Sequence, residues 1–188
     1  MIETERLVLR GWTDADVRGW AEMNADPRVM EFFPSTIPLE QSYESAERMR
    51  RELDERGYGW FVIERKERSG FFGVLALCEV RWETPFQPNR EIGWRLPVHA
   101  WGHGYATEGA RALLGFARDE MGWDEVVSFT ARSNERSQRV MQRIGMTRDA
   151  GADFLHPRIP EGNALRDHVL YRKMLQPNQD GGRDSHVS

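Results

Sequence analysis

The most informative segment of this chain is WRLPVHAWGHGYATEGARALL, residues Trp94 to Leu114. Its first part ends an apolar strand at Pro97, and its last part begins an amphipathic helix whose apolar residues recur every three or four positions. Gly102 and Gly104 lie between the strand and the helix. Because the first-turn N–H groups of a helix have no partner within it, a glycine loop here lets the backbone approach an anion such as phosphate.

Two common nucleotide-binding patterns do not fit this loop. A dinucleotide fingerprint needs a third glycine at the position that Thr107 occupies, and a Walker loop needs a Gly-Lys-Ser/Thr sequence that is missing here. Taken alone, the two glycines are equally compatible with a tight turn that binds nothing. The choice between a turn and an anion site therefore depends on the rest of the chain.

Length and composition are those of one globular domain. The chain has 188 residues, of which 39% are hydrophobic and 30% charged, enough for a sizeable core. The formal net charge is −4 and no stripe of Lys or Arg is present, which argues against nucleic acid as the main partner. The charged start lacks the apolar run of a signal peptide, and no segment has the length of a membrane span. We therefore expect a cytoplasmic protein that does not bind membranes.

The cysteine and histidine residues do not form a recognisable metal or thiol site. Cys78 is the single cysteine, and its apolar neighbours favour a core position over a nucleophile. His99 and His103 are four residues apart, but a glycine between them and a proline before them argue against a zinc-binding helix. Ordinary loop and strand positions are expected for His156 and His168. The sequence thus predicts no metal site.

The order of the expected elements is that of a mixed α/β fold. We expect strands at residues 6–10, 59–64, 71–80, 90–96, 124–131, from 146 and at 167–175, and helices at 13–25, 40–56, 106–121 and 133–144. This order predicts a central, mixed, largely antiparallel sheet of about six to seven strands with helices on both faces. Residues 1–176 would form a single domain, and the polar segment 177–188 is expected to be disordered.

Four short motifs follow one another along this predicted fold. They are TERLVLR at residues 4–10, WGHGYATE at 101–108, NERS to RIGM at 134–146 and HVLY at 168–171. Together they resemble the GNAT superfamily of acyl-CoA N-acyltransferases, and more closely its RimJ/RimL-like branch. The resemblance spans about residues 4 to 175. It implies the GNAT fold, with a sheet splayed at the cofactor cleft, and acetyl-CoA as co-substrate.

The resemblance also implies where acetyl-CoA binds. Pantetheine amides would pair with the main chain of Leu96 and Val98 as an added strand. Asn134 and Ser137 would contact the cofactor from the second motif, although plain helix capping is the alternative for both. The family's usual Gln or Arg at the loop entrance is replaced by Trp101, so a side-chain contact is lost there. The pyrophosphate would be held by N–H groups of Gly102, His103, Gly104, Ala106 and Thr107.

Acetyl transfer requires a neutral amine, a polarised thioester carbonyl and a proton for the leaving thiolate. Glu91 lies on the strand that would carry the thioester, where it could accept the amine proton directly or through water. A surface or core-pairing glutamate is the alternative. Many relatives use a tyrosine general acid in the second motif, but the matching residue here is Met141. Ser137, one turn earlier, is the expected substitute, and Tyr105 is a weaker candidate.

The resemblance places the acceptor pocket between the first two helices and the loop before the last strand. Its expected residues are Phe32, Phe33, Trp82, Phe86, Trp94 and the segment 153–163. An aromatic, acid-bearing cleft suits a cationic amine. The predicted function is direct acetyl transfer to a primary amine, on a protein N-terminus or on a small molecule such as an antibiotic, polyamine or aminoacyl compound. A non-catalytic acyl-CoA-binding sensor and a nucleotide-binding oxidoreductase are the alternatives, and a homodimer is expected from the family.

Overall fold

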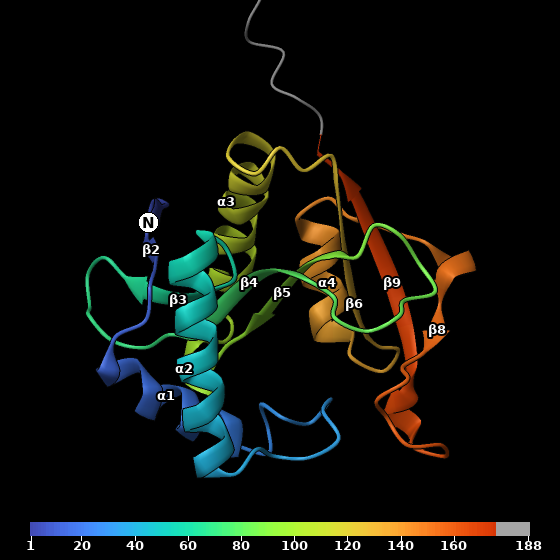
Figure 1. Cartoon of the computed structure of the whole chain (residues 1–188), viewed down its shortest axis with the longest axis horizontal. Helices are drawn as coiled ribbons and strands as arrows, with labels where there is room; N and C mark the ends of the chain where they lie inside the picture. Colours follow the sequence, from blue (N-terminus) through green and yellow to red (C-terminus); the bar gives the residue numbers. More distant parts are fainter. Residues whose placement is uncertain (176–188) are drawn as a thin grey trace, which may run out of the picture.

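One sheet runs through the whole molecule (Figure 1). The structure is a computed structural model that describes residues 1–175, so the predicted tail at 177–188 lies outside the described residues. The strands are β1 (Ile2–Glu3), β2 (Leu7–Arg10), β3 (Trp60–Arg65), β4 (Val74–Glu79), β5 (Arg90–Arg95), β6 (Glu125–Ala131), β7 (Thr147–Arg148), β8 (Phe154–Leu155) and β9 (Asp167–Met174). Their order in the sheet is β1-β2-β3-β4-β5-β6-β9-β7, and β8 also pairs with β9.

Helices cover both faces of this sheet. They are α1 (Asp14–Ala25), α2 (Leu39–Arg56), α3 (Tyr105–Asp119) and α4 (Glu135–Arg143), with short 3-10 turns at Val98–Ala100, Ala150–Ala152 and Ala164–Arg166. The ring of Trp60 in β3 packs 6.2 Å from Trp20 of α1, and the next residue, Phe61, packs 5.9 Å from Phe116 of α3. Because consecutive strand side chains point to opposite faces, α1 and α3 lie on opposite sides of the sheet.

The predicted mixed, largely antiparallel sheet with helices on both faces is confirmed. Two strands were not expected, β1 and β8, and both have only two residues. A segment this short has no alternation that a sequence pattern could reveal, and it becomes a strand through pairing with β2 or β9. No helix within residues 1–175 combines the length and the apolar character that a membrane crossing needs.

The parallel contact between β5 and β6 is where the sheet separates. β4 and β5 are paired antiparallel through six residue pairs, but β5 and β6 share the single pair Glu91 and Val127. Beyond that pair the two strands diverge, and residues 94–96 and 128–130 line one cleft. The splay expected at the cofactor cleft therefore follows from the short register between these strands.

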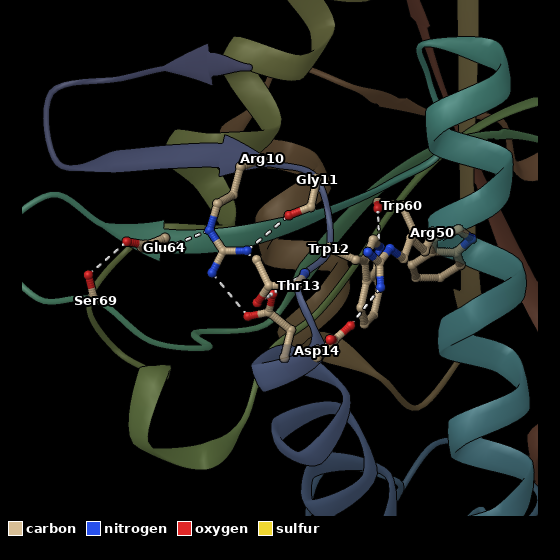
Figure 2. A network of polar contacts seen from close by, with 10 residues as sticks. Arg10, Gly11, Trp12, Thr13, Asp14, Arg50, Trp60, Glu64 and Ser69 are labelled. Carbon is tan, nitrogen blue, oxygen red and sulfur yellow. Dashed lines mark hydrogen bonds and ion pairs between the residues drawn. The ribbon is translucent and has the colours of Figure 1, made fainter.

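The start of α1 is tied to the sheet by Arg10 (Figure 2). Thr13 is the N-cap, and its backbone N–H and hydroxyl each donate to Asp16 Oδ2 at 2.7 Å. Arg10 donates to both carboxylate oxygens of Asp16, at 2.7 and 3.0 Å, and also pairs with Glu64 of β3. Burial raises the pKa of Asp16, but the hydrogen bonds from Arg10 and Thr13 bring it below its ordinary value. This network positions α1 against the sheet.

The first turn of α3 is held in place from two sides. A Cβ at Gly109 would lie 2.3 Å from Leu75 Cδ1, so glycine is what allows the helix to approach β4 this closely. The adjacent Glu108 accepts hydrogen bonds from Thr4 Oγ1 at 2.5 Å and from the backbone N–H of Arg6 at 2.9 Å. The N-terminal segment thereby fixes the turn that follows the glycine loop.

Candidate active site

A cleft of about 590 Å³ lies where β5 and β6 separate. Its walls come from the segment after α1, from β5, from the glycine loop with the first turn of α3, from β6, from α4 and from the segment before β9. Among the predicted site residues, those on the wall are Phe32, Phe33, Glu91, Trp94, Leu96, Gly102, Gly104, Ala106, Thr107, Asn134 and Ser137. The structure therefore brings most of the predicted residues to one place.

The glycine loop presents unpaired backbone donors to this cleft. Gly102 and Gly104 have φ values of +78° and +80°, which favour glycine. Within residues 1–175, the N–H groups from Gly102 to Thr107 donate to no protein acceptor. His103 does not line the cleft, because its exposed side chain stacks on Tyr105 with ring centroids 5.3 Å apart. The loop has the geometry of an anion site at a helix N-terminus.

Trp101 connects the loop to the end of β5. Its Nε1 donates to the carbonyl oxygen of Leu96 at 2.8 Å. The carbonyl of Leu96, which was predicted to pair with pantetheine, therefore already accepts one hydrogen bond. The guanidinium of Arg136 lies 4.5 Å from the centre of the indole ring. Val98 does not line the cleft, because the chain leaves the strand at Pro97 and turns into a 3-10 segment. The expected added strand beside Val98 is therefore not supported by the local backbone.

The start of α4 forms another wall through Asn134 and Ser137. Oδ1 of Asn134 accepts a hydrogen bond from the Ser137 N–H at 3.2 Å, and its Nδ2 donates to Thr130 Oγ1 at 2.9 Å. Asn134 thus caps the helix and also lies on the cleft wall. Met141, at the position where relatives carry a tyrosine, is 1% exposed and packs in the core. No hydroxyl reaches the cleft from that position.

Three arginines of α4 that the sequence reasoning did not single out also line the cleft. Arg136, Arg139 and Arg143 are spaced by three and four residues, so they project from one side of the helix. The same spacing is visible in the sequence ERSQRVMQR at residues 135–143, and it could have predicted that these arginines share one side of the helix. They line the same cleft as the unpaired N–H groups of the loop, and this cationic lining favours a bound anion.

Among residues 1–175, Glu91 is the only one that places a carboxylate on the wall of this cleft. Burial raises its pKa to about 7, and the weak contact from Cys78 Sγ at 3.8 Å opposes this only slightly. Burial also raises the pKa of the Cys78 thiol well above its ordinary value. The thiol therefore stays protonated, as a core residue would, while Glu91 changes protonation near neutral pH.

Trp82 and Phe86 do not reach the cleft wall, contrary to the expected acceptor pocket. Trp82 packs on Phe86 with ring centroids 6.0 Å apart and on Phe154 at 5.7 Å. These rings form a second, smaller hydrophobic cluster with Val127 and Leu170. The loop between β4 and β5 covers that end of the sheet, and burial of the large rings there keeps them away from the cleft.

Two histidines contribute to the wall instead. The rings of His156 and His168 are 4.8 Å apart, and both residues line the cleft. They belong to a loop and to β9, as expected. His156 lies in the segment 153–163 that was expected at the acceptor pocket, whereas the sequence did not place His168 at the site. Burial lowers the pKa of His168 to about 4 and lowers that of His156 from its ordinary value. Both rings are therefore neutral at pH 7.

The charge of the cleft differs from the expected acid-bearing pocket. Asp153 binds Arg132 at 3.0 Å and Arg148 at 2.6 Å, away from the wall, and Glu161 pairs with Arg166. Apart from Glu91 and the phenol of Tyr105, the ionisable side chains on the wall within residues 1–175 are histidines and arginines: His156, His168, Arg95, Arg136, Arg139, Arg143 and Arg158. Glu91 is therefore the acid that this cleft bears within residues 1–175, and the acids of segment 153–163 are paired with local arginines instead.

Comparisons with known proteins agree with this geometry. The family model described as an acetyltransferase (GNAT) domain matches residues 6–147. The uncharacterized N-acetyltransferase YnaD of Bacillus subtilis (strain 168) is 28% identical over 170 residues, which span 90% of this chain and 94% of that protein. A protein of the same species, YkkB, is 30% identical over 146 residues, which span 76% of this chain and 83% of that protein.

A solved structure extends the similarity to the fold. The crystal structure of a GNAT-family acetyltransferase from Bacillus anthracis has a TM-score of 0.77 to this chain at 26% identity, with 93% of this chain and 98% of that chain covered.

Proposed function

Since this chain belongs to the GNAT acetyltransferase family, we propose that it transfers an acetyl group from acetyl-CoA directly to a primary amine. One observation carries this proposal: the unpaired N–H groups of the glycine loop and the ionisable Glu91 line the same cleft. Glu91 lies near the start of β5, and the loop follows the end of that strand. The first feature suits a phosphate-bearing donor, and the second suits removal of a proton from an amine.

We assign the phosphates of acetyl-CoA to the glycine loop and the arginine side of α4. The N–H groups of Gly102, Gly104, Ala106 and Thr107 are free for the pyrophosphate, and Arg139 and Arg143 supply charge beside them. The pantetheine arm would follow the main chain near Leu96, and Asn134 and Ser137 would contact it from α4. The fit rests on unpaired donors in the loop and on the cationic lining of the cleft.

The proposed reaction has no covalent enzyme intermediate. The amine nitrogen attacks the thioester carbonyl carbon, the carbon–sulfur bond breaks, and the amine loses one proton to Glu91 directly or through a water molecule. Holding donor and amine together in one cleft supplies much of the acceleration. The leaving thiolate takes a proton from Ser137 or from a water held by it, and the proton that Glu91 accepted replaces it through solvent. A pKa of about 7 makes the Glu91 carboxylate available as a base in neutral solution.

The acceptor is proposed as a protein N-terminus or a small-molecule amine bound by Phe32, Phe33 and Trp94. Membership in the RimJ/RimL-like branch, a cytoplasmic location and a homodimer are proposals that rest on the sequence motifs. The non-catalytic alternative is favoured by one observation, the burial of Met141 where relatives carry a tyrosine.

A thiol-release assay with acetyl-CoA and a panel of amines and N-terminal peptides separates the two functions. The enzyme should release free thiol in proportion to the acetylated amine that mass spectrometry detects. Binding of acetyl-CoA in a calorimeter without thiol release on any acceptor, and without slow hydrolysis, would support the sensor and refute the enzyme.

A further inference from the structure

Arg95 has surroundings unlike those of the other arginines of the cleft. Its guanidinium carbon lies 4.2 Å from the ring centre of Phe33 and 5.1 Å from that of Trp20. Nη1 donates to Oδ1 of Asn24 in α1 at 2.6 Å. The buried Nε has no acceptor, and within residues 1–175 none is found for Nη2. Two donors along one edge of the guanidinium are therefore unused.

No acid neutralises this cation. The described residues place no carboxylate within ion-pair distance of Arg95, whereas Arg136 pairs with Glu31 and Arg139 pairs with Glu135 at 3.2 Å. Burial lowers the pKa of Arg95 to about 10, so the side chain is still charged at pH 7. A buried charge without a counter-ion is costly, and the aromatic rings offset only part of that cost. An anion from outside the chain would complete the site.

The position of Arg95 assigns that anion to the acceptor. Arg95 is held by Trp20 and Asn24 of α1, on the sheet face that α1 covers. Arg136 of α4 instead contacts Trp101, next to the glycine loop. Arg95 and Glu91 alternate onto one face of β5, with Gly93 between them, and their Cα atoms are about 13 Å apart along a strand. An acceptor in this end of the cleft would meet Glu91 and Arg95 together.

We propose that Arg95 binds a carboxylate of the acceptor, so that the preferred substrates are amines that also carry a carboxylate. The proposal rests on the proposed acetyl transfer and names its substrate class. A guanidinium is a preferred partner of a carboxylate, and Nη2 of Arg95 has no acceptor among the described residues. Polyamines and other purely cationic amines fit poorly, because the cation of Arg95 has no acid beside it to offset the repulsion.

The test compares each amino acid with its own neutral amide. Phenylalanine, 4-aminobutanoate and 6-aminohexanoate, each beside the corresponding amide, are assayed with the wild type, Arg95→Gln, Arg95→Lys and Arg139→Gln. Because each variant is compared with the wild type on the same compound, differences in amine basicity cancel. Thermal melting curves of all variants check the fold.

We expect acids to be acetylated more efficiently than their amides in at least one pair. Arg95→Gln should lower kcat/KM for that acid by about 10- to 100-fold, mainly through KM, and change the value for the amide by less than about threefold. Arg95→Lys keeps the charge without the paired donors and should give an intermediate loss. Arg139→Gln should raise the KM for acetyl-CoA and leave the ratio of acid to amide unchanged.

Three results would overturn the proposal: no acid preferred in any pair, equal losses for acid and amide in Arg95→Gln, or a changed KM for acetyl-CoA alone in that variant. If no amine is acetylated at all, the proposed function fails, and a binding measurement still decides the role of Arg95. Calorimetry with N-acetylphenylalanine and N-acetylphenylalaninamide on the CoA-saturated protein should show tighter binding of the acid, and Arg95→Gln should abolish that difference. Equal binding of the two compounds would refute the carboxylate site.

Discussion

Burial changes the ionisation of the two charged side chains that β5 presents to the cleft, and it favours the neutral form of each. It raises the pKa of Glu91 to about 7 and lowers that of Arg95 to about 10. Glu91 therefore gains and loses its charge near neutral pH, whereas Arg95 remains a cation. One strand face thus combines a group suited to proton transfer with a group suited to holding an anion.

The pH dependence of the reaction should report Glu91. A base acts in its deprotonated form, so kcat/KM should fall as the pH drops below about 7, the pKa to which burial raises this carboxyl. Glu91→Gln should lower kcat by about 10²- to 10⁴-fold and remove the change near pH 7, as measured by initial rates between pH 5.5 and 9.

A carboxylate outside the cleft provides the control for this experiment. Glu22 is exposed on α1 and pairs with Arg18, so Glu22→Gln should keep both the rate and the pH profile of the wild type. If Glu91→Gln also kept them, Glu91 would not be the base, and the amine proton would leave by another route.

At the scale of elements, the loop before α3 depends on two backbone positions and on contacts from far along the chain. The left-handed φ of Gly104 turns the chain so that the N–H groups of the first helical turn face the cleft. Thr4 and Arg6 hold Glu108 of that same turn. The opening motif and the loop motif are therefore parts of one structural unit.

Two glycine-to-alanine substitutions, one at the start of α3 and one within it, can distinguish an effect on the loop from an effect on the stability of the helix. Gly104→Ala places a side chain at φ +80°, although the nearest atom to its Cβ, Arg6 Nη2, is 3.6 Å away. Space is available, so the penalty comes from the backbone, about 1–2 kcal/mol. Relaxation of the loop should weaken acetyl-CoA binding by about tenfold or more in calorimetry.

Gly115→Ala is the matched control, because no atom lies within 4 Å of its Cβ and its φ is not left-handed. This change should stabilise α3 by up to about 1 kcal/mol through helix propensity and leave the affinity for acetyl-CoA as it was. If Gly104→Ala and Gly115→Ala had the same affinity for acetyl-CoA, acetyl-CoA would not bind at this loop.

At the scale of the whole molecule, the cleft divides the sheet into two parts, which are joined by a single residue pair between β5 and β6. Strands β1 to β5 form one part, and β6 to β9 form the other. The loop at Gly102 belongs to the first part and α4 to the second, with the Arg136 and Glu31 pair as a further link between them. A ligand that contacts both walls would therefore stabilise the entire fold.

Acetyl-CoA should raise the melting temperature of the protein. At a concentration of 100 times its Kd, a ligand that binds only the folded state adds about 2.7 kcal/mol, which corresponds to roughly 5–10 °C for a chain of this length. Differential scanning fluorimetry over a range of acetyl-CoA concentrations measures the shift. NADH at the same concentrations is the control and should give none; a shift with NADH and none with acetyl-CoA would favour the oxidoreductase alternative.

The local patterns of the sequence were sufficient for most elements and for part of the site. Gly57 ends α2 by adopting the left-handed conformation, Pro97 follows β5 and has no N–H to donate, and Asn134 begins α4 by capping it with its side chain. The same local logic predicted the glycine loop, but its interpretation as an anion site also depended on the motifs elsewhere in the chain. It could not place Trp82, because an aromatic residue in a loop can be buried against any nearby apolar surface, and here Phe154 supplies that surface.

Residues near one another in the chain were enough to predict the order of the elements, the glycine loop and the candidate base Glu91. Which charges face the cleft depends instead on how distant segments pack together. Asp153 is paired away from it, while Arg95 and His168 are brought into it by strands that pair with distant segments. Burial and charge pairing are set by neighbours in space, so the ionisation of Glu91 and the unpaired state of Arg95 required the fold.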